Sequence, residues 1–150
     1  MSLWGIGPKM IGGGVLTFVI GLLISTLSEV FKYPVSYKNC VIISLIFFLP
    51  GIALWLTSAY SVVKGFSEGR LVTTGAYAVV RNPLYASFII FIAPAFSFLL
   101  NSWLLLLSSV AMYLIFKACI VKEERFLKEK FGSAFTDYRR KVSRIIPFID

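Results

Sequence analysis

Hydrophobic residues run along this chain in long segments without charges, and polar residues gather between the segments. Residues 10–28 contain no charged side chain over 19 positions, and residues 39–63 contain none over 25 positions. At ~1.5 Å per residue, each segment is long enough for a helix across a hydrocarbon layer ~30 Å thick. The pattern therefore predicts two membrane-spanning helices, over residues 10–28 and 40–63.

The next uncharged segment is too long for a single crossing. Residues 82–116 would measure roughly 52 Å as one helix, well beyond the thickness of the hydrocarbon layer. Asn101 and Ser102 are the polar pair within it that suits a turn. We therefore expect a hairpin of two spans, over residues 83–100 and 103–121.

Two residues should modify this hairpin. Pro94 lies inside the third span, where its missing N–H group and its ring should kink the helix or open a local gap that neighbouring helices compensate. Lys117 lies near the end of the fourth span, and we expect its long side chain to reach the membrane interface.

The pattern becomes amphipathic from residue 122 onward. Leu127, Phe131, Phe135 and Tyr138 recur at spacings of four, four and three with charges between them, which is typical of a surface helix. Gly132 should end the first part of this segment as a C-terminal cap. The predicted fold class is all-α: an integral membrane bundle of about four transmembrane helices, followed by a cytoplasmic amphipathic segment over residues 122–148.

Composition agrees with a membrane protein. The chain is 58% hydrophobic and 15% charged over 150 residues, with a mean hydropathy of +0.85, and a soluble domain of this size could not bury so much apolar surface. The length favours one domain over residues 1–150. The first apolar stretch carries one early cation and lacks a small-x-small cleavage site, so we expect a retained span and not a signal peptide.

The basic residues are distributed unevenly between the loops. With four spans, the side that holds both termini and the loop 64–81 carries 13 of the 15 Lys and Arg residues, counting Lys117 with the tail. The opposite side carries Lys32 and Lys38. Because cytoplasmic loops are enriched in Lys and Arg, we expect both termini and the polar segments on the cytoplasmic side.

Several kinds of chemistry are disfavoured. The chain has no histidine, and Cys40 and Cys119 lie 79 positions apart, so the sequence offers no Ser-His pair, no zinc site, no haem ligand and no disulfide framework. We therefore predict no metal. The proposed spans have no ionisable residue near their centres, which disfavours a transporter or channel. The basic run near Arg140 indicates attraction to anionic lipids and not to nucleic acid, because no aromatic-rich soluble surface accompanies it.

Two polar segments remain as candidates for a site, residues 69–85 and 122–147, and the predicted topology places them side by side. Each also has a simple structural interpretation. Asn82 can cap the third span with Pro83 in its first turn, and Glu124 can form an exposed i,i+4 pair with Lys128. Taken singly, these features are weak signals of function.

The order of motifs across both segments is more specific. GxYxxVRNPxY runs from Gly75 to Tyr85, and a hydrophobic hairpin follows; EExxLxxxFG then begins at Glu123, and YxxxVxRxIP ends at Pro147. This order resembles the isoprenylcysteine carboxyl methyltransferase and phospholipid methyltransferase superfamily, over about residues 69–148. In one departure, the family usually has histidine where this chain has Asn82. Asparagine keeps hydrogen-bonding capacity but cannot carry a positive charge.

The resemblance implies S-adenosylmethionine as the cofactor and assigns the site residues. A glutamate, with Glu124 the first candidate, would hold the cofactor's ammonium group, and an arginine, with Arg81 the first candidate, its carboxylate, while a tyrosine would pack on adenine. Arg139 and Arg144 are candidates for binding an acidic acceptor. The implied catalytic residues are Arg81, Glu124, Arg139 and Arg144, and the implied cofactor-binding residues are Tyr77, Arg81, Asn82, Pro83, Tyr85, Glu123 and Glu124.

The expected function is therefore S-adenosylmethionine-dependent methylation of a lipidic or prenylated substrate, such as the carboxylate of an isoprenylated cysteine. A carboxylate is already an anion at pH 7, so a chain without histidine needs no general base for it. The alternatives are a phospholipid N-methyltransferase and a non-catalytic membrane structural protein with a degenerate site. A sterol-reductase-like enzyme is disfavoured, because the chain has no Gly-rich dinucleotide loop. The sequence leaves the acceptor and the oligomeric state open.

Overall fold

The structure, a computed structural model, describes residues 5–149. These residues form helices joined by short turns, with isolated β-bridges but no β-strand among them. The all-α prediction is confirmed. The principal helices are α1 (Gly7–Ser25), α2 (Tyr37–Ser67), α3 (Pro83–Ala86), α4 (Ala93–Leu99), α5 (Leu106–Phe131) and α6 (Ser133–Lys141). A π-helical segment, Ser87–Ile92, joins α3 to α4, and single 3-10 turns lie at Glu29–Phe31, Gly75–Ala78 and Trp103–Leu105.

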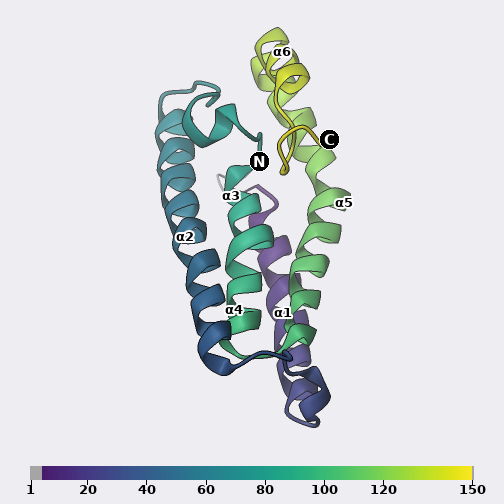
Figure 1. The fold of residues 1–150 in the computed structure, drawn as a ribbon. Coiled ribbons are helices and arrows are strands. Elements are labelled where there is room, and N and C mark those ends of the chain that lie inside the picture. The colour runs from purple at the N-terminus through teal and green to yellow at the C-terminus, as the bar shows by residue number, and fades with distance from the viewer. Residues whose placement is uncertain (1–4, 150) are drawn as a thin grey trace.

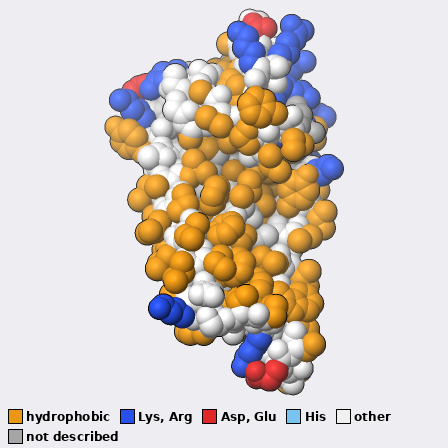
Figure 2. Space-filling view, viewed as in Figure 1, with side chains coloured by type: hydrophobic (Ala, Val, Ile, Leu, Met, Phe, Trp, Pro, Cys, Tyr) orange, Lys and Arg blue, Asp and Glu red, His pale blue; other side chains and the backbone are white. Residues whose placement is uncertain are grey.

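Apolar helices of membrane-spanning length dominate the fold. Gly7–Ser25, Tyr37–Ser67 and Trp103–Phe131 are long and apolar enough to cross a membrane, and Pro83–Leu99 is apolar but shorter. Figure 2 shows hydrophobic side chains covering the middle of the molecule, with Lys and Arg concentrated at its two ends. These features fit the predicted integral membrane bundle, with three helices of crossing length and a fourth, shorter apolar helix.

The boundaries of the first predicted span are wrong by three residues. Helix α1 begins at Gly7 and not at residue 10, with Pro8 in its first turn and Lys9 inside it. Proline suits the first turn because its missing N–H group has no partner there in any case. At the other end the helix stops at Ser25, and a turn follows before Ser28. The absence of charge located the span, but a charged residue in the first turn does not prevent the helix from starting.

The helix does not break at residue 122, where the amphipathic pattern begins. Helix α5 continues without interruption from Leu106 to Phe131, so the fourth span and the first part of the amphipathic segment form one helix. Charged residues do not end a helix when no glycine or proline lies among them. Gly132 ends the helix with φ of 58°, as predicted, and the short helix α6 follows.

The helix is locally irregular next to Pro94, where we expected a kink or a local gap. Immediately before it the helix widens into the π-helical segment, in which the N–H group of Ala93 donates to the carbonyl oxygen of Phe88, five residues earlier. A wider turn gives the proline ring room against the preceding turn. The hairpin turn also lies where it was predicted, at Asn101, which adopts a left-handed φ of 50°.

Small residues allow the helices to approach closely. Helix α1 packs mainly against α5, and α2 packs mainly against the segment from α3 to α4. A Cβ atom added to Gly51 in α2 would lie 2.7 Å from Cβ of Phe91, so this contact requires glycine. One at Gly14 in α1 would clash with the side chain of Met112.

Successive long helical segments of the bundle run in opposite directions. The first and last residues that the structure describes therefore lie on the same side of the molecule, together with α6 (Figure 1). The connection between α1 and α2, which contains Lys32, lies at the opposite end, and so does Lys38 in the first turn of α2. We refer to the end that carries α6 as the basic end.

This arrangement predicts the result of cysteine labelling in intact cells. Single cysteines at Glu68 and Asp137 should be protected from an impermeant reagent, because the basic end is expected in the cytoplasm. A cysteine in the loop between Lys32 and Lys38 should react. Labelling of Glu68 and Asp137 from opposite faces would contradict the four-span topology.

Candidate active site

The two polar segments meet at the basic end of the bundle. Val80 pairs with Ser143 in an isolated parallel β-bridge. The N–H group of Arg81 donates to the carbonyl oxygen of Ser143 at 2.7 Å, and that of Asn82 donates to the carbonyl oxygen of Arg144 at 2.9 Å. The prediction that these segments lie side by side is confirmed.

Asn82 occupies the N-cap position of α3, but its side chain does not cap the helix. Its Nδ2 atom donates to the carbonyl oxygen of Arg144 at 3.2 Å, and no side-chain capping bond forms. The side chain and main chain of Asn82 therefore both bind the same residue of the tail. The capping role suggested by the sequence is wrong, because this longer-range partner takes the amide.

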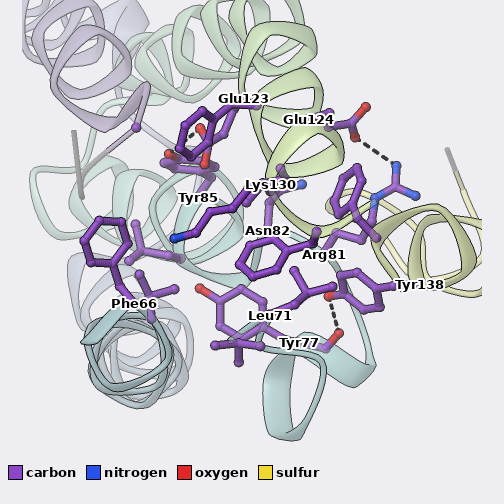
Figure 3. A pocket seen from close by; sticks show the side chains of 18 of the residues that line it. Phe66, Leu71, Tyr77, Arg81, Asn82, Tyr85, Glu123, Glu124, Lys130 and Tyr138 are labelled. Atoms are coloured by element: carbon purple, nitrogen blue, oxygen red, sulfur yellow. Dashed lines mark hydrogen bonds and ion pairs between the residues drawn. The ribbon is translucent and has the colours of Figure 1, made fainter. Parts of the chain in front are cut away.

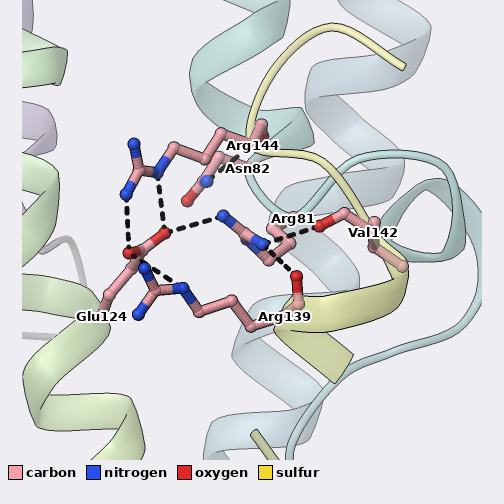
Figure 4. Close-up of polar contacts among 6 residues, drawn as sticks. All are labelled: Arg81, Asn82, Glu124, Arg139, Val142 and Arg144. Carbon is pink, nitrogen blue, oxygen red and sulfur yellow. Dashed lines mark hydrogen bonds and ion pairs between the residues drawn. The ribbon is translucent and has the colours of Figure 1, made fainter. Parts of the chain in front are cut away.

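Glu124 lies in a cluster of arginines (Figure 4), with only 6% of its surface exposed. Its Oε1 atom accepts from Nη2 of Arg81 at 3.1 Å and from Nε of Arg144 at 3.0 Å, and its Oε2 atom accepts from Nη2 of Arg144 at 3.1 Å. Nε of Arg139 lies 3.9 Å from Oε2. Glu124 is therefore a buried carboxylate facing several cations, and not half of an exposed pair with Lys128.

Arg81 connects three parts of the chain. It is buried, and its Nη1 atom donates to the carbonyl oxygens of Arg139 at 2.6 Å and Val142 at 2.7 Å, while Nη2 binds Glu124. Carbonyls in the last turn of a helix have no partner within the helix, and Arg81 binds those at the end of α6. The planar guanidinium group thus fastens α6 and the tail to α5.

Glu123 faces another environment. Its Oε2 atom accepts from the hydroxyl of Tyr85 at 3.0 Å and from the N–H group of Ile6 at 3.3 Å. Within residues 5–149 no Lys or Arg forms an ion pair with it. Gly5 passes so close that an added Cβ atom would lie 2.5 Å from Oε2 of Glu123. The charge of this half-buried carboxylate therefore has hydrogen-bond donors around it but no opposite charge.

Two tyrosines complete the polar side of the site. The hydroxyl of Tyr138 donates to the carbonyl oxygen of Tyr77 at 2.6 Å. Burial raises the pKa of both Tyr77 and Tyr138 further above neutral pH, at which a phenol is already protonated. Protonated phenols can donate hydrogen bonds and present flat apolar faces.

These groups surround a cavity of about 150 Å³ at the basic end (Figure 3). One wall of the cavity is polar and the other is apolar. Side chains from the end of α2 and from the loop after it form the apolar wall. The polar lining includes Tyr77, Arg81, Asn82, Tyr85, Glu123, Glu124 and Tyr138, and the apolar lining includes Ala59, Val62, Val63, Phe66, Leu71 and Phe131.

The cavity does not include every residue that the sequence suggested. Pro83, Arg139 and Arg144 are absent from its lining, although both arginines approach Glu124. Arg70 and Lys130 do line it and were missed. For Lys130 a signal existed, because a residue seven positions after Glu123 lies on the same helix face.

Comparison with known proteins agrees with the motif pattern. The family model for phospholipid methyltransferases matches residues 38–134. Protein-S-isoprenylcysteine O-methyltransferase of Schizosaccharomyces pombe is 39% identical over 86 residues, which cover 57% of this chain and 36% of that protein. Its counterpart in Saccharomyces cerevisiae is 29% identical over 131 residues, or 81% of this chain and 54% of that protein. Protein-S-isoprenylcysteine O-methyltransferase B of Arabidopsis thaliana is 31% identical over 81 residues, or 54% of this chain and 41% of that protein. The match thus spans between about a third and half of each relative.

Proposed function

Because the chain belongs to the phospholipid methyltransferase family, we propose that it transfers a methyl group from S-adenosylmethionine to the carboxylate of a prenylated cysteine. The relatives described above carry the name of this reaction. The observation that carries the proposal is the two-sided cavity. It combines tyrosines and a carboxylate that forms no ion pair among residues 5–149 with an apolar wall from α2. Such a cavity suits a charged cofactor beside an amphiphilic acceptor.

The charges of the cavity fit the cofactor. S-adenosylmethionine carries an ammonium group and a sulfonium, and Glu123 is a half-buried carboxylate without an ion pair among residues 5–149. Burial raises the pKa of Glu123, and a cation bound next to it would favour its ionised form. In our proposal Glu123 holds the ammonium group, and Tyr77 and Tyr85 offer ring faces to adenine.

Glu124 and Arg81 have a different role in this proposal. Both oxygens of Glu124 already accept from arginines, and the guanidinium group of Arg81 already binds Glu124 and two carbonyl oxygens. We therefore assign these residues to holding the tail and α6 beside the cavity. This replaces direct contact of Glu124 with the ammonium group, which the resemblance implied.

The residues of the cavity then need to perform little acid-base chemistry. The bound cofactor supplies a methyl group already activated by its sulfonium. The acceptor carboxylate is an anion at pH 7 and requires no base. What remains for the protein is to align the two groups and exclude water, which apolar side chains such as Phe66 and Leu71 can do.

Methylation of a phospholipid amine is the second candidate, favoured by the family description. An ammonium group must lose its proton before attack, so that reaction would require a base or a desolvated site. The products separate the two candidates. A methyl ester releases methanol in alkali, and an N-methyl group does not.

The test is incubation of the purified protein with methyl-labelled S-adenosylmethionine and a membrane lipid extract, with and without N-acetyl-S-farnesylcysteine. We expect label in the farnesylcysteine product, released as methanol by alkali. Alkali-stable label in phospholipid would favour the amine acceptor. No transfer to either acceptor, in folded protein that binds the cofactor, would overturn the proposed reaction.

Cofactor binding should also stabilise the fold. S-adenosylmethionine or its demethylated product should raise the stability by ~2.7 kcal/mol at a concentration one hundred times the dissociation constant. The measurement is thermal unfolding in detergent across a ligand series. No shift at millimolar ligand would favour a structural protein with a degenerate site.

A further inference from the structure

Lys130 reaches across the cavity from the last turn of α5 (Figure 3). Its Nζ atom lies 4.8 Å from the ring centroid of Phe66 on α2 and 5.2 Å from that of Phe131. Within the described part of the chain, residues 5–149, no carboxylate forms an ion pair with it. The ammonium group therefore contacts aromatic rings at the cavity and has no carboxylate partner there.

Lys130 differs in this respect from the other cations that line the cavity. Arg70 forms an ion pair with Glu68, and Arg81 binds Glu124 together with two carbonyl oxygens. A cation–π contact at an accessible site is weak compared with a charge-assisted hydrogen bond, so it leaves the ammonium group able to bind an anion. Lys130 is thus the cavity cation best placed to receive an acidic ligand.

The surroundings of Lys130 limit what that ligand can be. Ala59, Val62 and Val63 line the cavity from the same helix as Phe66, so the wall facing the lysine is apolar. A ligand that satisfies both features carries an anionic group next to a long hydrocarbon chain. A small hydrophilic anion would leave the apolar wall without a partner.

We infer that Lys130 binds the carboxylate of an amphiphilic acceptor and thereby determines which acceptors the cavity selects. This rests on the proposed function, and it adds the residue that distinguishes an acidic acceptor from a neutral one. The hydrocarbon chain lies along α2, and the ammonium group of Lys130 orients the carboxylate. Arg139 and Arg144 are not needed for this contact, since neither lines the cavity.

The test measures binding without turnover. Dissociation constants are determined for N-acetyl-S-farnesylcysteine and for its carboxamide, both in the presence of S-adenosylhomocysteine. The wild-type protein should bind the carboxylate roughly tenfold or more tightly than the amide, the range expected for a charge-assisted contact. Lys130→Met, which keeps an unbranched apolar chain, should remove this preference, and Lys130→Arg should retain it.

Lys128→Met is the matched control, because Lys128 lies in the same turn of α5 and does not line the cavity. It should keep the wild-type preference. A Lys130→Met variant that also keeps the preference would overturn the inference, and so would a wild type that binds acid and amide equally or binds neither. If Lys130→Met lowers the melting temperature and leaves the binding preference unchanged, the role of Lys130 is to hold α2 against α5 through its contact with Phe66, and the inference is overturned. Failure of the wild type to bind S-adenosylhomocysteine would instead count against the proposed function.

Discussion

Replacing Glu124 with glutamine should destabilise the protein by about 3 kcal/mol, because breaking one side of a buried ion pair leaves the other charge uncompensated. Arg81 and Arg144 lie within 3.1 Å of this carboxylate, and the side chain of Arg81 is only 3% exposed. The amide nitrogen of glutamine would face guanidinium donors and could accept nothing from them. The same change should loosen α6, since Arg81 also binds the carbonyl oxygens at its end.

Thermal unfolding in detergent measures this effect. For a chain of this size, the loss corresponds to a fall of roughly 6–12 °C in melting temperature. Glu129→Gln is the control, because Glu129 is exposed on the same helix and does not line the cavity. Equal melting temperatures for the Glu124 and Glu129 variants would mean that the arginine cluster contributes little to stability.

Replacing Glu123 with glutamine should lower the affinity for the cofactor and leave the stability of the fold almost unchanged, in contrast to the Glu124 variant. The amide oxygen can still accept from the hydroxyl of Tyr85 and the N–H group of Ile6, so the local hydrogen bonds survive. What disappears is the negative charge. The loss of a charge-assisted contact of ~1.5 to 3 kcal/mol should weaken S-adenosylmethionine binding roughly tenfold to more than a hundredfold.

Titration of S-adenosylmethionine into the wild type and the Glu123, Glu124 and Glu129 variants separates the two roles. The Glu123 variant should keep its melting temperature in the absence of ligand and show the weaker binding. If Glu123→Gln binds as the wild type does, while a folded Glu124→Gln binds weakly, the ammonium group is held by Glu124 as the sequence resemblance implied.

The contrast between the two glutamates has a geometric origin. Adjacent residues on an α-helix point about 100° apart, because one turn contains 3.6 residues. On α5 this rotation directs Glu123 toward Tyr85 and the start of α1, and Glu124 toward the arginines of the loop and tail. Glu123 and Glu124, which are adjacent in the motif, therefore lie in two different environments.

Much of the fold was readable from local sequence. Long uncharged segments located the helices of the bundle, because no other backbone arrangement satisfies the hydrogen bonds of a single apolar segment in lipid. Asn101 and Gly132 marked the hairpin and the end of α5 correctly, and a π-helical segment lies next to Pro94, where a local distortion was expected. The positive φ at Asn101 and Gly132 is a local backbone property, whereas Pro50 lies inside α2 without ending it. The motif order likewise indicated the family.

The site depended on contacts between residues far apart in sequence. Arg81 meets Glu124 over a separation of 43 positions, and Asn82 meets Arg144 over 62. Periodicity placed Glu124 on a helix but could not show that arginines surround it. It placed Lys130 on the same helix face as Glu123 but could not show that Phe66 of α2 lies opposite. Nor did it show that the fourth span and the first part of the amphipathic segment form one continuous helix, Leu106–Phe131. The packing of the helices decides which side chains line the cavity. That packing depends on residues throughout the chain and not on any local pattern.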